Sequence, residues 1–239
     1  MISNIPIDLI ILICSIILSI ILCLTTINLL NDNLIFKAKA LLTLSMFNWL
    51  SILISTCIIY LFSSELYELW ITDHYNLSQL ITTNIYLLLL LIGSITVLMA
   101  DIHEQYILDY STYIIGFANV GLLLCFIFIP QAIYEPFIAL YFNNLYSHIA
   151  SFVCTALIFG STYIYKKEAI GEGDLLLLAA ITPTLGIINL LTLLNYTFIS
   201  AAIFAIINLV LYKDRTRHMA LGPFIVLAYL AILYIHLFS

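Results

Sequence analysis

The chain has 239 residues, of which 64% are hydrophobic and 8% are charged, and its mean hydropathy is +1.17. So little polar side chain cannot cover a water-soluble globule, which excludes that class and indicates an integral membrane protein surrounded by lipid. The formal net charge is −6, from 7 Lys and Arg against 13 Asp and Glu. Nucleic acid is excluded as a partner, because its recognition requires a basic surface.

The amino-terminal apolar segment is predicted to be a retained membrane helix. A cleavable signal peptide has basic residues before a short apolar region. Here no Lys or Arg precedes the apolar run, Asp8 lies at its start, and the run continues to Leu30. We therefore count this segment as the first helix of the bundle.

Apolar runs of membrane-spanning length recur along the whole chain. A spanning helix needs about 20 mostly apolar residues, and continuous rather than alternating runs argue against a β-barrel. The sequence predicts an all-α, polytopic membrane bundle of about eight transmembrane helices, at residues 8–30, 40–63, 79–100, 112–130, 146–165, 175–194, 197–212 and 220–237. The seventh helix requires a tight turn at residues 195–197. We divide the chain into 1–78, two helices of unclear role, and a core at 79–239.

The positive residues segregate to one side of such a bundle. With eight spans, all seven fall in the loops that follow the first, fifth and seventh helices, at Lys37, Lys39, Lys166, Lys167, Lys213, Arg215 and Arg217. Short loops rich in Lys and Arg face the cytoplasm. The opposite loops have no Lys or Arg, and carry Glu65, Glu68, Asp73, His74 and Glu135. Both termini are therefore predicted to lie outside the cytoplasm.

An acidic loop at residues 101–112 joins the third and fourth predicted helices. Asp101 lies at the carboxyl end of a membrane helix, where the helix dipole disfavours an anion by up to about 1 kcal/mol. Such a residue is either a hydrated marker of the membrane interface or functional. Asp109 precedes the fourth helix, and we favour a role as its N-cap. His103 and Glu104 are interpreted as solvated loop residues.

A second acidic cluster precedes the sixth predicted helix and contains Gly171-Glu172-Gly173-Asp174. The structural interpretation of Asp174 is an N-cap. Capping does not explain the two glycines, which permit close approach of another backbone where the carboxylate emerges. Because this cluster and the acidic loop share one membrane face, a site with two carboxylates is expected.

Paired carboxylates suit peptide hydrolysis. Two carboxyl groups within about 3 Å cannot both ionise, so they share one proton near neutral pH. The ionised group takes a proton from water, and the protonated group donates to a peptide carbonyl oxygen. This aspartyl-protease chemistry needs no cofactor or metal, and the sequence has no HExxH, GxSxG, Walker A or CxxC motif.

These residues resemble the motifs of the type IV prepilin peptidases, membrane aspartyl proteases of the GxGD type. In that family a catalytic Asp is followed a few positions later by Ile-Pro-Asp or Ile-Pro-Asn and then Thr. Here Asp101 is followed by Ile107-Leu108-Asp109 and Thr112. The second family motif is similar to residues 167–174, which read KEAIGEGD, and the third is similar to Gly222-Pro223-Phe224.

The resemblance implies specific roles. Asp101 and Asp174 would be the catalytic pair, Gly171 and Gly173 would shape the second loop, and the supporting residues would be Asp109, Thr112, Gly222 and Pro223. The implied substrate is a prepilin or pseudopilin, cleaved at the cytoplasmic face of the bacterial inner membrane.

The chain also departs from the family pattern. Leu108 replaces the Pro of the first motif, and Leu176 stands where members often carry a Lys. The loop at residues 31–40 contains no Cys, whereas larger members insert a CxxC-bearing segment there that is associated with methylation. Zinc binding and N-methyltransferase activity are therefore not expected.

Two other functional classes stay open from the residues alone. A proton-coupled carrier would use acidic residues and broken helices as an ion site. A non-catalytic scaffold of a pilus or secretion machine would not need either aspartate. Acid-to-amide substitution of the aspartates separates the three classes. It abolishes cleavage in a peptidase and ion flux in a carrier, and it has no effect in a scaffold.

Overall fold

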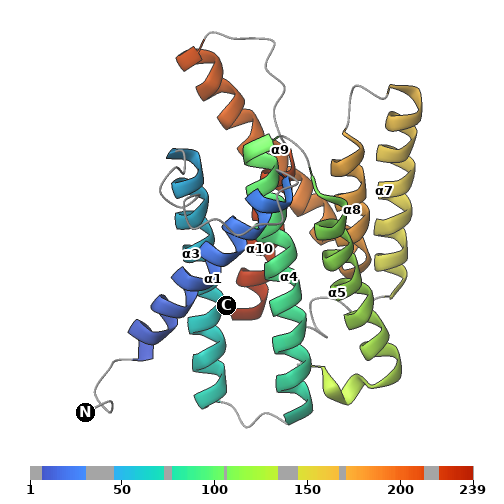
Figure 1. Cartoon of the computed structure of the whole chain (residues 1–239). Coiled ribbons are helices and arrows are strands. Elements are labelled where there is room, and N and C mark those ends of the chain that lie inside the picture. The colour runs from blue at the N-terminus through green and yellow to red at the C-terminus, as the bar shows by residue number, and fades with distance from the viewer. Residues whose placement is uncertain are drawn as a thin grey trace.

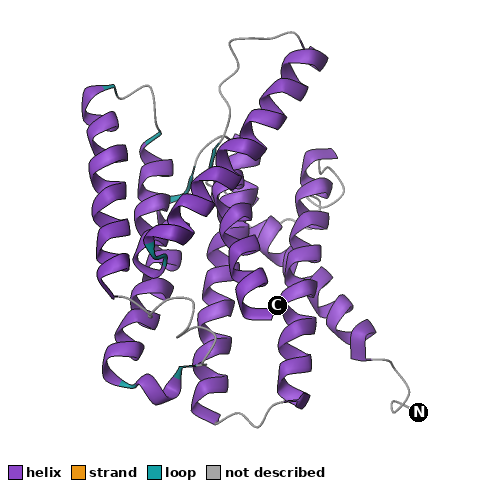
Figure 2. Ribbon diagram, turned by 180° about the vertical axis from the view of Figure 1, so that it is seen from behind, coloured by secondary structure: helices purple, strands orange, loops and turns teal. Residues whose placement is uncertain are grey.

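The structure of the chain, a computed structural model, describes residues 7–30, 46–72, 77–104, 107–133, 145–166, 171–212 and 221–238. All regular structure in these ranges is helical (Figure 2). The α-helices are α1 (Ile7–Leu30), α3 (Met46–Thr72), α4 (Leu77–Glu104), α5 (Asp109–Phe128), α7 (Leu145–Tyr165), α8 (Glu172–Ile181), α9 (Ile187–Tyr212) and α10 (Gly222–Phe238). Two 3-10 helices, η1 (Pro130–Ala132) and η2 (Thr182–Thr184), follow α5 and α8.

Successive α-helices alternate in direction through the bundle (Figure 1). As a result α4, α7 and α9 end, and α5, α8 and α10 begin, at the upper end in that view. We call this the aspartate end, because it holds Asp101, Asp174 and Gly222. Residues far apart in the sequence are thus brought to one face of the bundle.

The outward-facing helices are covered with apolar side chains. Six described helices are long and apolar enough to cross a membrane, and α10 is a shorter apolar helix. The spans in α1, α7 and α9 are each only 22% buried, and they expose large side chains such as Ile17, Leu157 and Ile188. The span in α4 is 56% buried, so α4 is the central helix. The predicted all-α polytopic membrane bundle is confirmed.

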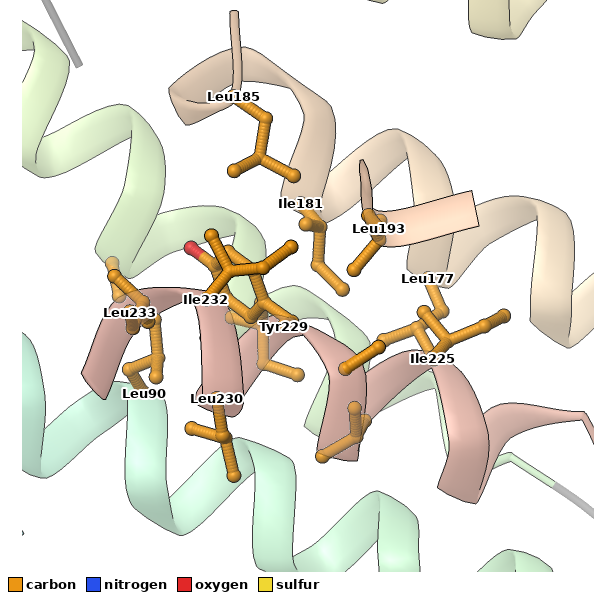
Figure 3. Close-up of a cluster of buried hydrophobic side chains, with 14 of the residues drawn as sticks. Leu90, Leu177, Ile181, Leu185, Leu193, Ile225, Tyr229, Leu230, Ile232 and Leu233 are labelled. Carbon is orange, nitrogen blue, oxygen red and sulfur yellow. The ribbon is translucent and has the colours of Figure 1, made fainter. Parts of the chain in front are cut away.

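Close packing holds the central helices together. Lipid tails are as apolar as leucine, so helix association in a membrane depends on packing and interhelical hydrogen bonds. Buried Leu, Ile and Tyr side chains from α4, α8 and α10 meet in one core, among them Leu90, Leu177, Ile181 and Tyr229 (Figure 3).

The prediction was wrong about the sixth and seventh helices. In the structure the α-helical conformation is interrupted at residues 182–186, between α8 and α9. Helix α9 then continues without a break through residues 195–197, where a turn was expected. Pro183 is the physical reason, because it has no N–H to donate and its ring clashes with the carbonyl four residues earlier. With 10 residues, α8 is about 15 Å long and too short to cross a membrane.

The irregular backbone at this break is satisfied by α7. The Ser151 hydroxyl lies 3.0 Å from the carbonyl oxygen of Thr182 and 2.5 Å from that of Leu185. The Ile187 N–H donates to the Ser147 hydroxyl oxygen at 2.9 Å. Non-helical backbone is tolerated at membrane depth only where protein buries it in this way.

Helix α3 is longer than predicted and includes Glu65 and Glu68, which were expected in a loop. The Tyr234 hydroxyl of α10 donates to Glu65 at 2.8 Å, so this carboxylate ties α3 to the core. Most residues used for the orientation prediction lie outside the described part, namely Lys37, Lys39, Lys167, Lys213, Arg215, Arg217, Asp73, His74 and Glu135.

Candidate active site

Asp101 lies in the last turn of α4 and is buried, with 3% of its surface exposed. It accepts a hydrogen bond from the backbone N–H of Gly222, at the start of α10. Its Oδ2 atom is buried and has no hydrogen-bond partner among the described residues. Leaving a buried carboxylate oxygen unpaired is costly, so its retention calls for a functional explanation.

Asp174 lies in the first turn of α8, but it is not the N-cap. The N-cap is Gly171, so the structural interpretation of Asp174 from the sequence was wrong. The Asp174 side chain folds back toward Gly171, with Oδ2 3.2 Å from the point that a Cβ on that glycine would occupy. Burial raises the pKa of Asp174 from 3.8 to about 6. Its carboxyl group therefore takes up a proton at a pH much nearer neutrality than an exposed aspartate does.

Ile107 packs between the two halves of the site. This side chain follows Asp101 along the chain and is 5% exposed. A Cβ on Gly173 would lie 2.9 Å from the Ile107 Cβ, and a Cβ on Gly222 would lie 2.9 Å from its Cδ1. Asp174 is also close enough to act electrostatically on Asp101. The structure thus brings the two predicted aspartates together.

The Gly222-Pro223 pair forms the third side of the site, and both residues are buried. A Cβ on Gly222 would collide with the Asp101 carboxylate. Pro223 lies in the first turn of α10, where its missing N–H costs no intrahelical hydrogen bond. The absence of a side chain at position 222 therefore makes room for Asp101.

Comparison with known families decides the class of the protein. A sequence model described as "Type IV leader peptidase family" matches residues 69–206, more than half of the chain and the part that contains both aspartates. The chain belongs to the type IV leader peptidase family. No curated protein and no solved structure matches the chain significantly. The resemblance to the prepilin peptidases is thus confirmed, and the chain is a membrane-embedded member of a peptidase family.

The supporting residues of this leader peptidase homologue differ in their surroundings. Helix α5 begins at Asp109, which is exposed, and its N-cap is Leu108 without a side-chain cap, so the predicted capping role of Asp109 was wrong. Thr112 is 3% exposed, and its Oγ1 has no hydrogen-bond partner among the described residues. The side chains of His103 and Glu104 lie outside the described part.

Among the described residues, no three His, Cys, Asp or Glu side chains are grouped as a metal site. The interaction between ionisable groups at the site is that of Asp174 with the Asp101 carboxyl group.

Sequence analysis missed a polar network deeper in the bundle, formed by Tyr86, Asn119, Thr184 and Tyr229. All four residues are at most 3% exposed. The available signal was an Asn within the otherwise apolar α5, since buried polar side chains in membranes face the bundle interior. Pro183 was a second signal, because it ends a helix one residue earlier.

Proposed function

We propose that the protein is a membrane aspartyl endopeptidase that cleaves the leader peptide of prepilin or pseudopilin-like substrates. Asp101 and Asp174 are its catalytic pair. One observation carries the proposal: the buried Asp101 and the partly buried Asp174 come from separate helices and converge at one end of the bundle, around the Ile107 side chain and glycines with no room for a side chain.

The proposed reaction is hydrolysis by a shared proton. The ionised carboxylate takes a proton from a water molecule, whose oxygen attacks the peptide carbonyl carbon, while the protonated carboxyl donates its proton to the carbonyl oxygen. The C–N bond then breaks, and the nitrogen leaves with a proton returned by the pair. The unpartnered Oδ2 of Asp101 and the raised pKa of Asp174 support this use of one proton between two groups.

The aspartate end is proposed to face the cytoplasm of a bacterial inner membrane, with both termini on the other side. The positive residues of the sequence support this orientation, and the exposed Lys166 follows α7 at the aspartate end. The exposed Asp109 and Glu172, with Glu104 nearby in sequence, would attract the basic leader of a substrate. The proposal covers cleavage and not N-methylation.

The test is co-expression with a prepilin in cells lacking their own peptidase, with substrate size read on a gel. Wild type is expected to cleave, and Asp101→Asn and Asp174→Asn to lose at least about a thousandfold in rate, because neither retains a pair that can share a proton. Asp8→Asn, an exposed carboxylate on α1, is the matched control and should cleave normally.

Other outcomes assign the chain to another class. If Asp101→Asn and Asp174→Asn still cleave, the catalytic assignment is refuted. If well-expressed wild type leaves several prepilins intact, proton flux in vesicles is measured next. Flux lost in both variants identifies a carrier, and no flux identifies a scaffold.

A further inference from the structure

A hydrogen-bonded network at the far end of α8 connects this short helix to its neighbours. The Asn119 Nδ2 of α5 donates to the carbonyl oxygen of Ala180 at 2.9 Å. The hydroxyls of Tyr86 on α4 and Tyr229 on α10 both donate to the Asn119 Oδ1, at 3.1 and 3.0 Å. Four helices therefore meet at one amide group.

The Ala180 carbonyl fixes the orientation of that amide. A carbonyl oxygen only accepts, so the donor Nδ2 must face Ala180, and Oδ1 then faces the Tyr86 and Tyr229 hydroxyls, which donate to it. These two hydroxyls also lie 3.2 Å from each other, and that of Tyr229 lies 3.2 Å from the Thr184 hydroxyl. In the reversed orientation, Oδ1 would face the carbonyl oxygen of Ala180, and two acceptors would oppose each other. Asn119 is 0% exposed, so no solvent competes for these bonds.

The Ala180 carbonyl differs from the other carbonyls in the last turn of α8. The last four carbonyls of a helix have no intrahelical partner. In α8, Leu178 is satisfied by the Thr182 N–H, Ala179 by the Thr182 hydroxyl at 3.4 Å and Ile181 by the Thr184 hydroxyl at 3.0 Å. Those three bonds are local. Of these four carbonyls, Ala180 alone is held by another helix within the described part of the chain.

Close packing supports the same contact. Gly116 lies one turn before Asn119 on α5, and a Cβ there would lie 3.5 Å from the Ala180 Cβ. Small residues let two helix backbones approach closely. Asp174 lies six residues before Ala180 on the same short helix, about 9 Å away along its axis. Movement of the α8 end would therefore move Asp174.

We propose that Asn119 is a positioning residue for Asp174, which holds α8 against α5 and α10 and sets how closely Asp174 approaches Asp101. The inference rests on the proposed function of the two aspartates. Tyr86 and Tyr229 act through Asn119 by donating to its amide oxygen, and none of the three touches the reacting groups.

The test compares variants of the full-length protein in lipid nanodiscs. Asn119→Leu removes the amide at similar volume, and Tyr229→Phe removes one hydroxyl and keeps the ring in place. Tyr234→Phe is the matched control: it removes a phenolic hydroxyl from the same helix, but that hydroxyl donates to Glu65 on α3. The mild Tyr229→Phe keeps the test informative if Asn119→Leu does not fold.

The kinetic readout is the split between kcat and KM on a prepilin substrate. Because a displacement of about 1 Å can cost about 100-fold in rate, kcat should fall about 10- to 100-fold in Asn119→Leu and several-fold in Tyr229→Phe. KM should change by less than about threefold, and Tyr234→Phe should match wild type. The pH at which kcat is half-maximal should also move. If kcat falls by the same factor at every pH, the variants have only lost folded protein, and the proposal is overturned.

Hydrogen exchange gives a readout that does not depend on activity. Amides of residues 172–186 should exchange faster in both network variants and not in Tyr234→Phe. Unchanged exchange there refutes the anchoring of α8 by Asn119, whatever the kinetics. If wild type cleaves nothing, the proposed function fails, and the exchange result alone decides whether Asn119 anchors α8.

Discussion

The aspartate end and the Asn119 network treat buried polar atoms in opposite ways. At the network, the Asn119 amide accepts two hydrogen bonds and donates one, within 2.9–3.1 Å. At the aspartate end, Asp101 Oδ2 and Thr112 Oγ1 are buried without a hydrogen-bond partner in the described part of the chain. The first region stabilises the bundle, whereas the second carries an energetic cost.

This contrast indicates that the Asn119 network serves the stability of the bundle, whereas the aspartate end serves its proposed activity. Unpaired polar groups and raised pKa values cluster at functional sites, where a fold tolerates strain that packing elsewhere offsets. The two regions are joined by α8, which has Asp174 at one end and the Ala180 carbonyl at the other. The following predictions ask whether the two ends can be perturbed independently.

The largest effect at the aspartate end is expected from Gly222→Ala. The added Cβ would collide with the Asp101 carboxylate and lie 2.9 Å from the Ile107 Cδ1. Gly222 has no positive φ, so the backbone itself accepts alanine and the loss comes from displaced site atoms. Cleavage should fall at least about 100-fold, measured on purified protein.

Gly160→Ala on α7 is the matched control, because a Cβ there would have nothing within 4 Å. It should cleave like wild type and melt at the same temperature or slightly higher. Full activity of Gly222→Ala would show that the aspartate end is loosely packed, and the contrast with the network would fail.

A smaller effect is expected on stability from Asp174→Asn. Burial raises the pKa of Asp174 from 3.8 to about 6, so the folded state binds a proton that the unfolded state has released between these values. Wild-type stability should therefore fall as the pH rises from about 4 to about 6 and then level off. The variant lacks this ionisation and should be more stable by about 1–3 kcal/mol above pH 6.

Thermal melting at pH 4, 6 and 8 measures this gain. The difference between variant and wild type should be largest at pH 8 and vanish near pH 4. A variant less stable than wild type at pH 8 would mean that the Asp174 carboxylate stabilises the fold, contrary to a site that costs stability.

The sequence was sufficient for what depends on local pattern. Long apolar runs predict membrane helices, and the acidic motifs at helix ends led to Asp101 and Asp174. It was insufficient where one residue acts through a distant partner. The importance of Asn119 depends on Tyr229 and Ala180, and no local pattern links these positions. The break at Pro183 was visible locally, but the apolar run across it outweighed that signal.

Leu108→Pro is expected to give the smallest effect, and it would introduce the proline of the Ile-Pro-Asp pattern that residues 107–109 resemble. Leu108 is the N-cap of α5 and has φ −72° and ψ 124°, values that the proline ring favours. Its carbonyl oxygen, which accepts from the Ser111 hydroxyl at 2.6 Å, is kept by proline. The substitution should stabilise the protein by about 0.4–1 kcal/mol by restricting the unfolded chain. Cleavage should stay within about twofold, because Asp101 and Ile107 keep their contacts. Destabilisation in a melting experiment would mean that Ile107 cannot adopt the extended backbone that a following proline requires, and the aspartate end would then depend on a leucine at this position.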